Sequence, residues 1–278
     1  MVRFGYDGQG FAGWARQPGR RTVEGELRAG LVRAGIVASL PEARLEVASR
    51  TDAGVSARAN ALAITSPLPG PALLRALNGV APDVFAIAAR TVPDGFRVRR
   101  AVCREYRYFL PGQRQRAATL DRGARLVGTS VDVRSFGRGT SSKDPVLRPI
   151  LPIRASFTRG VVRIDVRAPS FVWGMVRKLV AALLEWEAGR LADSDLVNAA
   201  TGERPRTLPM VPADGLVLWE VTYPLRWTVH AARLSRAQRR HLENARRSAA
   251  VRRPVLGAIT SVVPDPGRST LRTLQHNI

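Results

Sequence analysis

The order in which strand-like and helix-like segments follow one another is the sequence feature that most constrains the fold. Alternating apolar side chains predict strands, as in GVVRIDVRA at residues 160–168. Apolar stripes at helical spacing predict helices, the strongest in SFVWGMVRKLVAALLEWEAGRL at 170–191, which Ser170 is placed to cap. The order is strand, helix, strand, strand, helix, strand, strand, and then a second strand-and-helix set, so hairpins outnumber crossovers. This order predicts an α+β fold with helices on one face of a largely antiparallel sheet.

The net charge of +22 over 278 residues predicts a polyanionic partner. Such an excess of one sign opposes the compact state, and nucleic acid is the commonest polyanion that offsets it. Compositional bias is the alternative, because Lys143 and Lys178 are the only lysines and all other basic residues apart from histidine are arginine. That bias accounts for arginine in place of lysine, but not for the small number of acidic residues. The charge therefore favours nucleic-acid binding.

The chain ends in a basic extension at residues 226–278. This segment carries eleven arginines against Glu243 and Asp265, so +9 of the net charge lies there and +13 remains in the body. Within it, SRAQRRHLENARRSAAVRR at 235–253 fits either a basic helix or a solvated tail. An RNA-binding arm is the functional interpretation of the helix.

Histidine and cysteine usage limits the chemistry that the body can perform. His230, His241 and His276 all lie in the last fifty residues, which excludes a Ser-His or Cys-His pair and a His-bearing zinc site from the body. The single cysteine, Cys103, excludes an intrachain disulfide and fits a reducing compartment. The sequence has no apolar run of membrane-spanning length and begins without a secretory signal, so we expect a cytoplasmic protein.

A polar loop in ASRTDAGVSARAN, residues 48–60, joins two strand-like segments and contains Asp52. Asp and Gly are common in turns, so a plain turn is one interpretation. The other is chemical, because an ionised carboxylate can act as a nucleophile without a histidine base. Gly54 would let a ligand approach the backbone, and Arg50 is placed to bind phosphate or to fill a gap in a base stack.

Two further stretches carry residues suited to the same chemistry. In REYRY, residues 104–108, Tyr106 either stacks on a base or packs in the core. In SFVWGMVRKLV, residues 170–180, Arg177 falls on the helix side away from the apolar stripe. There it is either the partner of a carboxylate or an exposed surface charge.

Taken together and in this order, the motifs resemble those of the tRNA pseudouridine synthase A family. SRTDAGVSA is similar to the family's GRTDAGVHA, REYRY to RxYRY, and FVWGMVRKLV to FLYHMVRNIVG. Further similarity is seen in YDGQGFAGWARQ, TVEGEL, VPDGFRVRRA and VPADGLVL. The resemblance covers roughly residues 3–224 and does not extend to the basic extension.

The resemblance implies both a fold and an activity. It implies two RRM-like halves, residues 1–105 and 106–225, that form one continuous, mostly antiparallel sheet with a central basic cleft. The implied activity is isomerisation of uridine to pseudouridine in tRNA, usually in the anticodon stem-loop, without a metal or an organic cofactor. The family works as a homodimer that binds tRNA across both subunits.

The resemblance also assigns roles to single residues. Asp52 corresponds to the catalytic aspartate, which either attacks the ribose C1′ or promotes glycal formation. Arg50, in the same loop, helps to flip the target nucleotide out, and Thr51 is a further RNA-binding candidate beside it. Tyr106 packs against the target base, Arg177 pairs with the aspartate, and Leu216 lines the pocket. We therefore expect the Asp52 carboxylate and the Arg177 guanidinium within salt-bridge distance at the floor of a basic cleft.

Departures from the family pattern affect substrate choice rather than catalysis. Ser49 replaces a glycine, Ser56 a frequent histidine and Asn60 a common glutamine, while Trp173 and Gly174 replace an aromatic-His pair. Two alternatives stay open: a catalytically silent RNA-binding protein on the same fold, and a metal-dependent nuclease that uses carboxylates. Retention of Asp52 argues against the first, and the scattered acidic residues of the body argue against the second.

Overall fold

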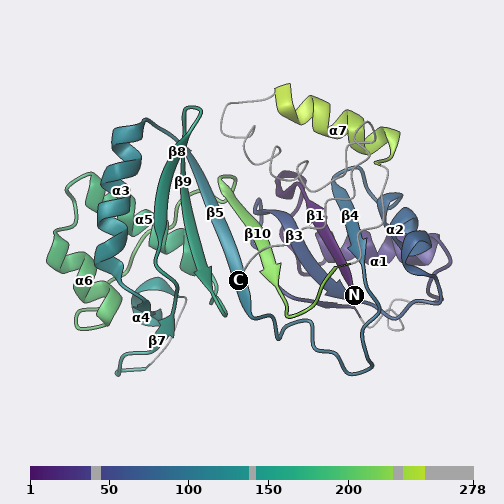
Figure 1. The fold of residues 1–278 in the computed structure, drawn as a ribbon, viewed down its shortest axis with the longest axis horizontal. Coiled ribbons are helices and arrows are strands. Elements are labelled where there is room, and N and C mark those ends of the chain that lie inside the picture. Colours follow the sequence, from purple (N-terminus) through teal and green to yellow (C-terminus); the bar gives the residue numbers. More distant parts are fainter. Residues whose placement is uncertain (39–44, 138–141, 228–233, 248–278) are drawn as a thin grey trace.

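The structure is a computed structural model that describes residues 1–38, 45–137, 142–227 and 234–247. Among these residues, eight strands form one sheet (Figure 1). Seven of them follow one another across the sheet in the order β4 (Val84–Ala89), β1 (Val2–Tyr6), β3 (Ser56–Ala63), β10 (Leu216–Thr222), β5 (Cys103–Pro111), β9 (Val161–Ala168) and β8 (Arg154–Thr158). The short β2 (Glu46–Val47) also pairs with β3. All pairs are antiparallel except β3 with β10, so the predicted mostly antiparallel sheet is confirmed.

The central strand β10 joins two parts of the sheet, one made of β4, β1 and β3 and the other of β5, β9 and β8. Val217 and Leu218 pair with Ser56 and Ala57 of β3, and Leu218 also lies opposite Tyr106 of β5. Among the described strands, β10 is the only one that hydrogen-bonds to both β3 and β5. The proposed division of the chain at residue 105 stays a prediction, and that position lies inside β5.

Most helices lie on one face of the sheet, as predicted. They are α1 (Val23–Arg33), α2 (Gly70–Asn78), α3 (Arg114–Val127), α4 (Val133–Phe136), α5 (Met175–Glu187) and α6 (Asp193–Thr201). Near them are the 3-10 turn η1 (Gly8–Gly10) and a two-stranded sheet of β6 (Ser130–Asp132) and β7 (Leu147–Pro149). Leu27 of α1 and Leu179 of α5 belong to the same buried core as Ile164 of β9. No helix within the described ranges has the length and apolar character that crossing a membrane requires.

The helix α5 begins later than the sequence predicts. It starts at Met175 rather than directly after Ser170, because Gly174 adopts φ of +76° and ends the preceding loop in a left-handed conformation. Residues 170–174 are therefore a loop, and Arg177 lies in the first turn of the helix instead of its second. The apolar stripe of the helix is buried as predicted.

The opposite face of the sheet is covered in part by α7 (Arg236–Arg247), which belongs to the basic extension (Figure 1). Leu242 belongs there to a buried cluster with Phe85, Phe109 and Val217. Of the two interpretations of residues 235–253, the structure therefore supports a basic helix for 236–247, and the rest of that segment lies outside the described residues.

Polar contacts fix α7 to the sheet. The amide of Gln238 is completely buried, and its Nε2 donates to the Val84 carbonyl at 2.6 Å and to Asn78 Oδ1 at 3.1 Å. His241 Nε2 lies 3.1 Å from Asp7 Oδ2, directly before η1. These contacts make α7 part of the folded body rather than a solvated tail.

Replacing Gln238 by alanine is expected to lower the free energy of unfolding by about 1–3 kcal/mol, because the buried Val84 carbonyl loses its donor. Arg239→Ala on the same helix, at an exposed position, is the matched control and is expected to change stability little. Equilibrium denaturation of both variants measures the difference. Equal midpoints for Gln238→Ala and the wild type would show that the contact does not stabilise the fold.

Candidate active site

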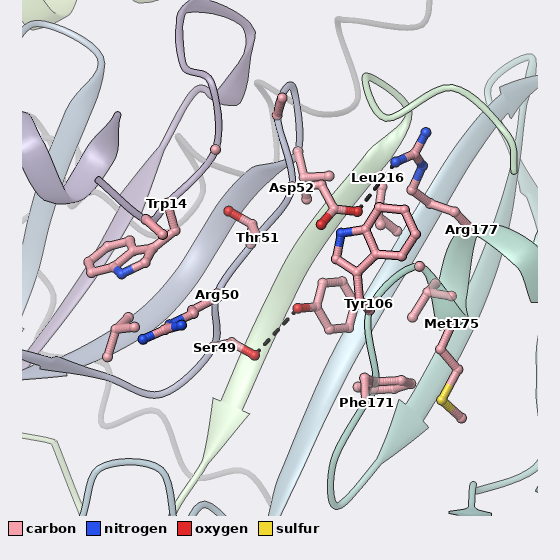
Figure 2. Close-up of a pocket in the computed structure, with 18 of the residues that line it drawn as sticks. Trp14, Ser49, Arg50, Thr51, Asp52, Tyr106, Phe171, Met175, Arg177 and Leu216 are labelled. Carbon is pink, nitrogen blue, oxygen red and sulfur yellow. Dashed lines mark hydrogen bonds and ion pairs between the residues drawn. The ribbon is translucent and has the colours of Figure 1, made fainter. Parts of the chain in front are cut away.

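A cavity of about 1030 Å³ opens where the two parts of the sheet meet on its helix-bearing face (Figure 2). Its walls come from segments far apart in sequence: residues 12–17, the loop at 47–53 and the loop and first turn of α5 at 170–177. Tyr106 of β5 and Leu216 of β10 contribute from the sheet itself. The cavity therefore forms only when both parts of the chain are folded together.

Hydrogen bonds to the N-terminal segment hold the loop that carries Asp52 in place. Gly54 adopts φ of +80°, and its N–H donates to the Phe11 carbonyl at 3.3 Å. The Trp14 N–H donates to the Thr51 carbonyl at 3.0 Å. Thr51 is buried, and its hydroxyl lies 2.7 Å from the hydroxyl of Tyr6. These contacts direct the Thr51 side chain into the protein and leave the neighbouring Asp52 at the cavity.

The predicted ion pair between Asp52 and Arg177 is confirmed. Arg177 Nη1 donates to Asp52 Oδ2 at 3.3 Å, across 125 residues of sequence (Figure 2). The guanidinium is itself fixed, because its Nε donates to the Val211 carbonyl at 2.8 Å. The Asp52 side chain is 24% exposed and that of Arg177 is 17% exposed. The carboxylate is therefore oriented by a charge-assisted hydrogen bond and is still open to the cavity.

Tyr106 lies at the base of the cavity, between its two walls (Figure 2). The residue is buried, and burial, with a smaller contribution from the Asp52 charge, raises the pKa of the Tyr106 phenol, so the hydroxyl stays neutral at physiological pH. Its hydroxyl lies 3.4 Å from Ser49 Oγ, and its ring meets the edge of Phe171 at 5.1 Å between centroids. Of the two interpretations of Tyr106, packing in the core is confirmed, while stacking on a base stays a prediction for a ring that lines the cavity. Leu216 is also buried and lines the same floor.

The two walls of the cavity differ in chemistry. Arg50 is exposed and lies with Trp14 on one side of Tyr106, while Phe171 and Met175 lie on the other side (Figure 2). Arg20 and Arg99 also line the cavity and are exposed. The cleft predicted from the resemblance is therefore basic, and its exposed cations belong to the N-terminal part of the chain.

Sequence reasoning did not identify Arg104, which holds together the loops that form the cavity. This arginine is buried, and its guanidinium donates to the carbonyls of Ala48 at 3.1 Å, Arg99 at 2.6 Å and Pro169 at 2.5 Å. It thereby ties the start of the Asp52 loop to the start of the loop that leads into α5. One signal could have revealed it: in REYRY, Arg104 has the same strand parity as the inward-facing Tyr106, so an arginine there must find buried partners.

Comparisons with known proteins identify the family of the chain. A family model described as tRNA pseudouridine synthase matches residues 124–224. Proteins named tRNA pseudouridine synthase A are similar over most of the chain. The protein of Thermococcus kodakarensis is 35% identical over 80% of this chain and 84% of its own length, and that of Thermococcus sibiricus is 34% identical over 88% and 93%. The protein of Methanocorpusculum labreanum is 35% identical over 94% of this chain and 92% of its own.

These matches define the class of the protein as an isomerase of the pseudouridine synthase type. Within that class, the chain belongs to the tRNA pseudouridine synthase A family. A chain in the crystal structure of a Cbf5-Nop10-Gar1 complex also aligns over 66% of this chain and 53% of its own length. Its TM-score of 0.32 and its identity of 11% are too low to add to this assignment.

Proposed function

We propose that this protein converts specific uridines in the anticodon stem-loop of tRNA to pseudouridine, with Asp52 as the nucleophile. The observation that carries the proposal is the Asp52 carboxylate, which is paired with Arg177 and opens into a basic cavity above Tyr106. An ionised carboxylate in this setting needs no histidine to activate it.

The proposed reaction is an isomerisation in which every bond broken is matched by one formed. A carboxylate oxygen of Asp52 attacks the ribose C1′, and the C1′–N1 bond breaks so that uracil leaves with the electron pair. The free uracil turns until its C5 faces C1′, and the C5–C1′ bond forms as the aspartyl ester bond breaks. The C5 proton is then lost to solvent and N1 takes up a proton, which leaves the composition of the RNA unchanged.

Residues around Asp52 have supporting roles in the same proposal. A uridine in folded RNA must leave its stack to reach the carboxylate, at a cost of a few kcal/mol. The exposed guanidinium of Arg50 is suited to fill the vacated space, and the neutral ring of Tyr106 offers a face to the uracil. Arg177 holds the carboxylate toward C1′, and Leu216 closes the floor against water.

The proposal extends to the assembly and its setting. We take the protein to act as a homodimer in the cytoplasm, with one tRNA contacting both subunits and with the two halves of each subunit meeting near residue 105. The support for these points is the resemblance of the motifs together with the strongly basic charge of the chain.

Tritium release tests the proposal. Unmodified tRNA transcripts with tritium at C5 of uracil lose the label when C5 bonds to carbon, so the purified protein is expected to release tritium in proportion to pseudouridine formed. Mapping of the product is expected to place the modified uridines in the anticodon stem-loop. Binding of tRNA without any release would instead identify a catalytically silent RNA-binding protein.

A further inference from the structure

Trp173 is the one exposed aromatic side chain among the described residues. Trp173 is 46% exposed, whereas every other aromatic residue in the described part of the chain is buried or half-buried. Trp173 lines the same cavity as Asp52 and Tyr106. Single exposed apolar side chains are common on protein surfaces, so it is the position of Trp173 in the cavity, rather than its exposure alone, that suggests a ligand contact.

The chain holds Trp173 at the cavity through a constrained loop. Gly174, the next residue, adopts φ of +76°, and a Cβ atom there would lie 3.0 Å from Met210 Sδ. Met210 is itself 36% exposed, so its side chain comes to the surface near Gly174. The loop is fixed at its start by the bond from Arg104 to the Pro169 carbonyl and at its end by the bond from the Met175 N–H to the Val172 carbonyl. An aromatic ring on so restricted a loop loses little freedom when a ligand stacks on it.

The cavity is larger than a single nucleotide needs. Its volume of about 1030 Å³ lies at the upper limit of the range of about 300–1000 Å³ that is typical of sites for one small molecule. In the proposed function, Tyr106 and Leu216, which line the floor, would contact one base beside Asp52. The exposed Arg20, Arg50 and Arg99 suit a phosphate backbone, while Trp173, which lines the cavity two residues after Phe171, is not used in the proposed reaction.

We propose that Trp173 is a stacking site for an unpaired nucleobase next to the target uridine. The inference deepens the proposed function, because it assigns a second base-binding position to the RNA that enters the cavity. Every nucleobase has a face that stacks on an aromatic ring, so the site reads an unstacked neighbour rather than a particular sequence. The substrate must then have single-stranded character beside the modified uridine.

The test compares three variants in binding to an unmodified tRNA transcript. Trp173→Phe keeps an aromatic ring, whereas Trp173→Leu keeps apolar bulk without one. We expect the dissociation constant to rise about 5- to 150-fold for Trp173→Leu and for Trp173→Ala, which corresponds to about 1–3 kcal/mol for one stacked base. Trp173→Phe is expected to retain most of the affinity. Equal affinity of Trp173→Leu and Trp173→Phe would overturn the inference, because apolar packing alone would then explain the contact.

A second measurement identifies the base. Replacing single nucleotides that flank the target uridine by abasic ribose is expected to weaken binding to the wild type at one position and to have little further effect on Trp173→Ala. Additive losses at every position would contradict stacking on Trp173. Binding does not require turnover, so this result is independent of tritium release. A protein that shows the stacking pattern without pseudouridine formation would refute the proposed function and leave the base site standing.

Discussion

Replacing Asp52 by asparagine is expected to abolish pseudouridine formation, with a loss of about 10⁴-fold or more in the single-turnover rate. The amide oxygen of asparagine is a poor nucleophile, but the side chain has the same shape and can still accept the bond from Arg177 Nη1. The loss should therefore appear in the chemical step and not in folding or in tRNA affinity. Tritium release at saturating enzyme, measured alongside tRNA binding, separates these effects.

The matched control for this substitution is Asp144→Asn. Asp144 is exposed and does not line the cavity, so the same change of chemistry there is expected to leave the rate unchanged. Equal rates of conversion by Asp52→Asn and the wild type would contradict the proposal that Asp52 is the nucleophile.

Replacing Arg177 by methionine is expected to lower kcat by about 10²- to 10³-fold, the range seen when one preorganised donor is removed from an active site. Methionine keeps the apolar stem of the arginine and removes both the bond to Asp52 and the bond to the Val211 carbonyl. Since Arg177 is mostly enclosed by protein, KM for tRNA is expected to change little. Arg177→Lys should recover part of kcat, because a lysine keeps the charge but cannot make both bonds in the same geometry.

Arg190→Met provides the control for the loss of a cation near the same helix. Arg190 is exposed just beyond the end of α5 and pairs with Glu185, so its replacement is expected to preserve both kcat and KM. Steady-state kinetics on the two methionine variants would test the difference. A wild-type kcat for Arg177→Met would show that the ion pair does not position the carboxylate.

The fold could be predicted from the sequence where its determinants are local. Alternation in GVVRIDVRA and the apolar stripe of α5 are properties of short segments, and both elements are present as predicted. The pairing of Asp52 with Arg177 is not local, and it was predictable because two motifs were recognised together. The predicted start of α5 was wrong because Gly174, in a left-handed conformation, ends the loop four residues after the capping serine that the sequence offered.

Features that depend on contacts between distant parts of the chain could not be predicted from the sequence. The position of α7 depends on the hydrogen-bond partners of Gln238. These partners are Asn78 and Val84, about 160 residues earlier in the chain. The segment for which the sequence left a basic helix and a solvated tail open is thus a docked helix, held by Gln238 together with Leu242 and His241. Arg104 shows the same limit, because its three acceptor carbonyls come from three separate loops.

The central place of β10 has a consequence for synthesis on the ribosome. Chains emerge from the N-terminus, so β1 to β9 are made before the strand that joins β3 to β5. Until residues 216–222 leave the ribosome, β3 and β5 lack the strand that pairs with both of them, so the loop that carries Asp52 and the strand that carries Tyr106 are not yet joined through one sheet. A nascent chain therefore carries the Asp52 carboxylate for most of its synthesis before the sheet that forms the floor of its cavity is complete.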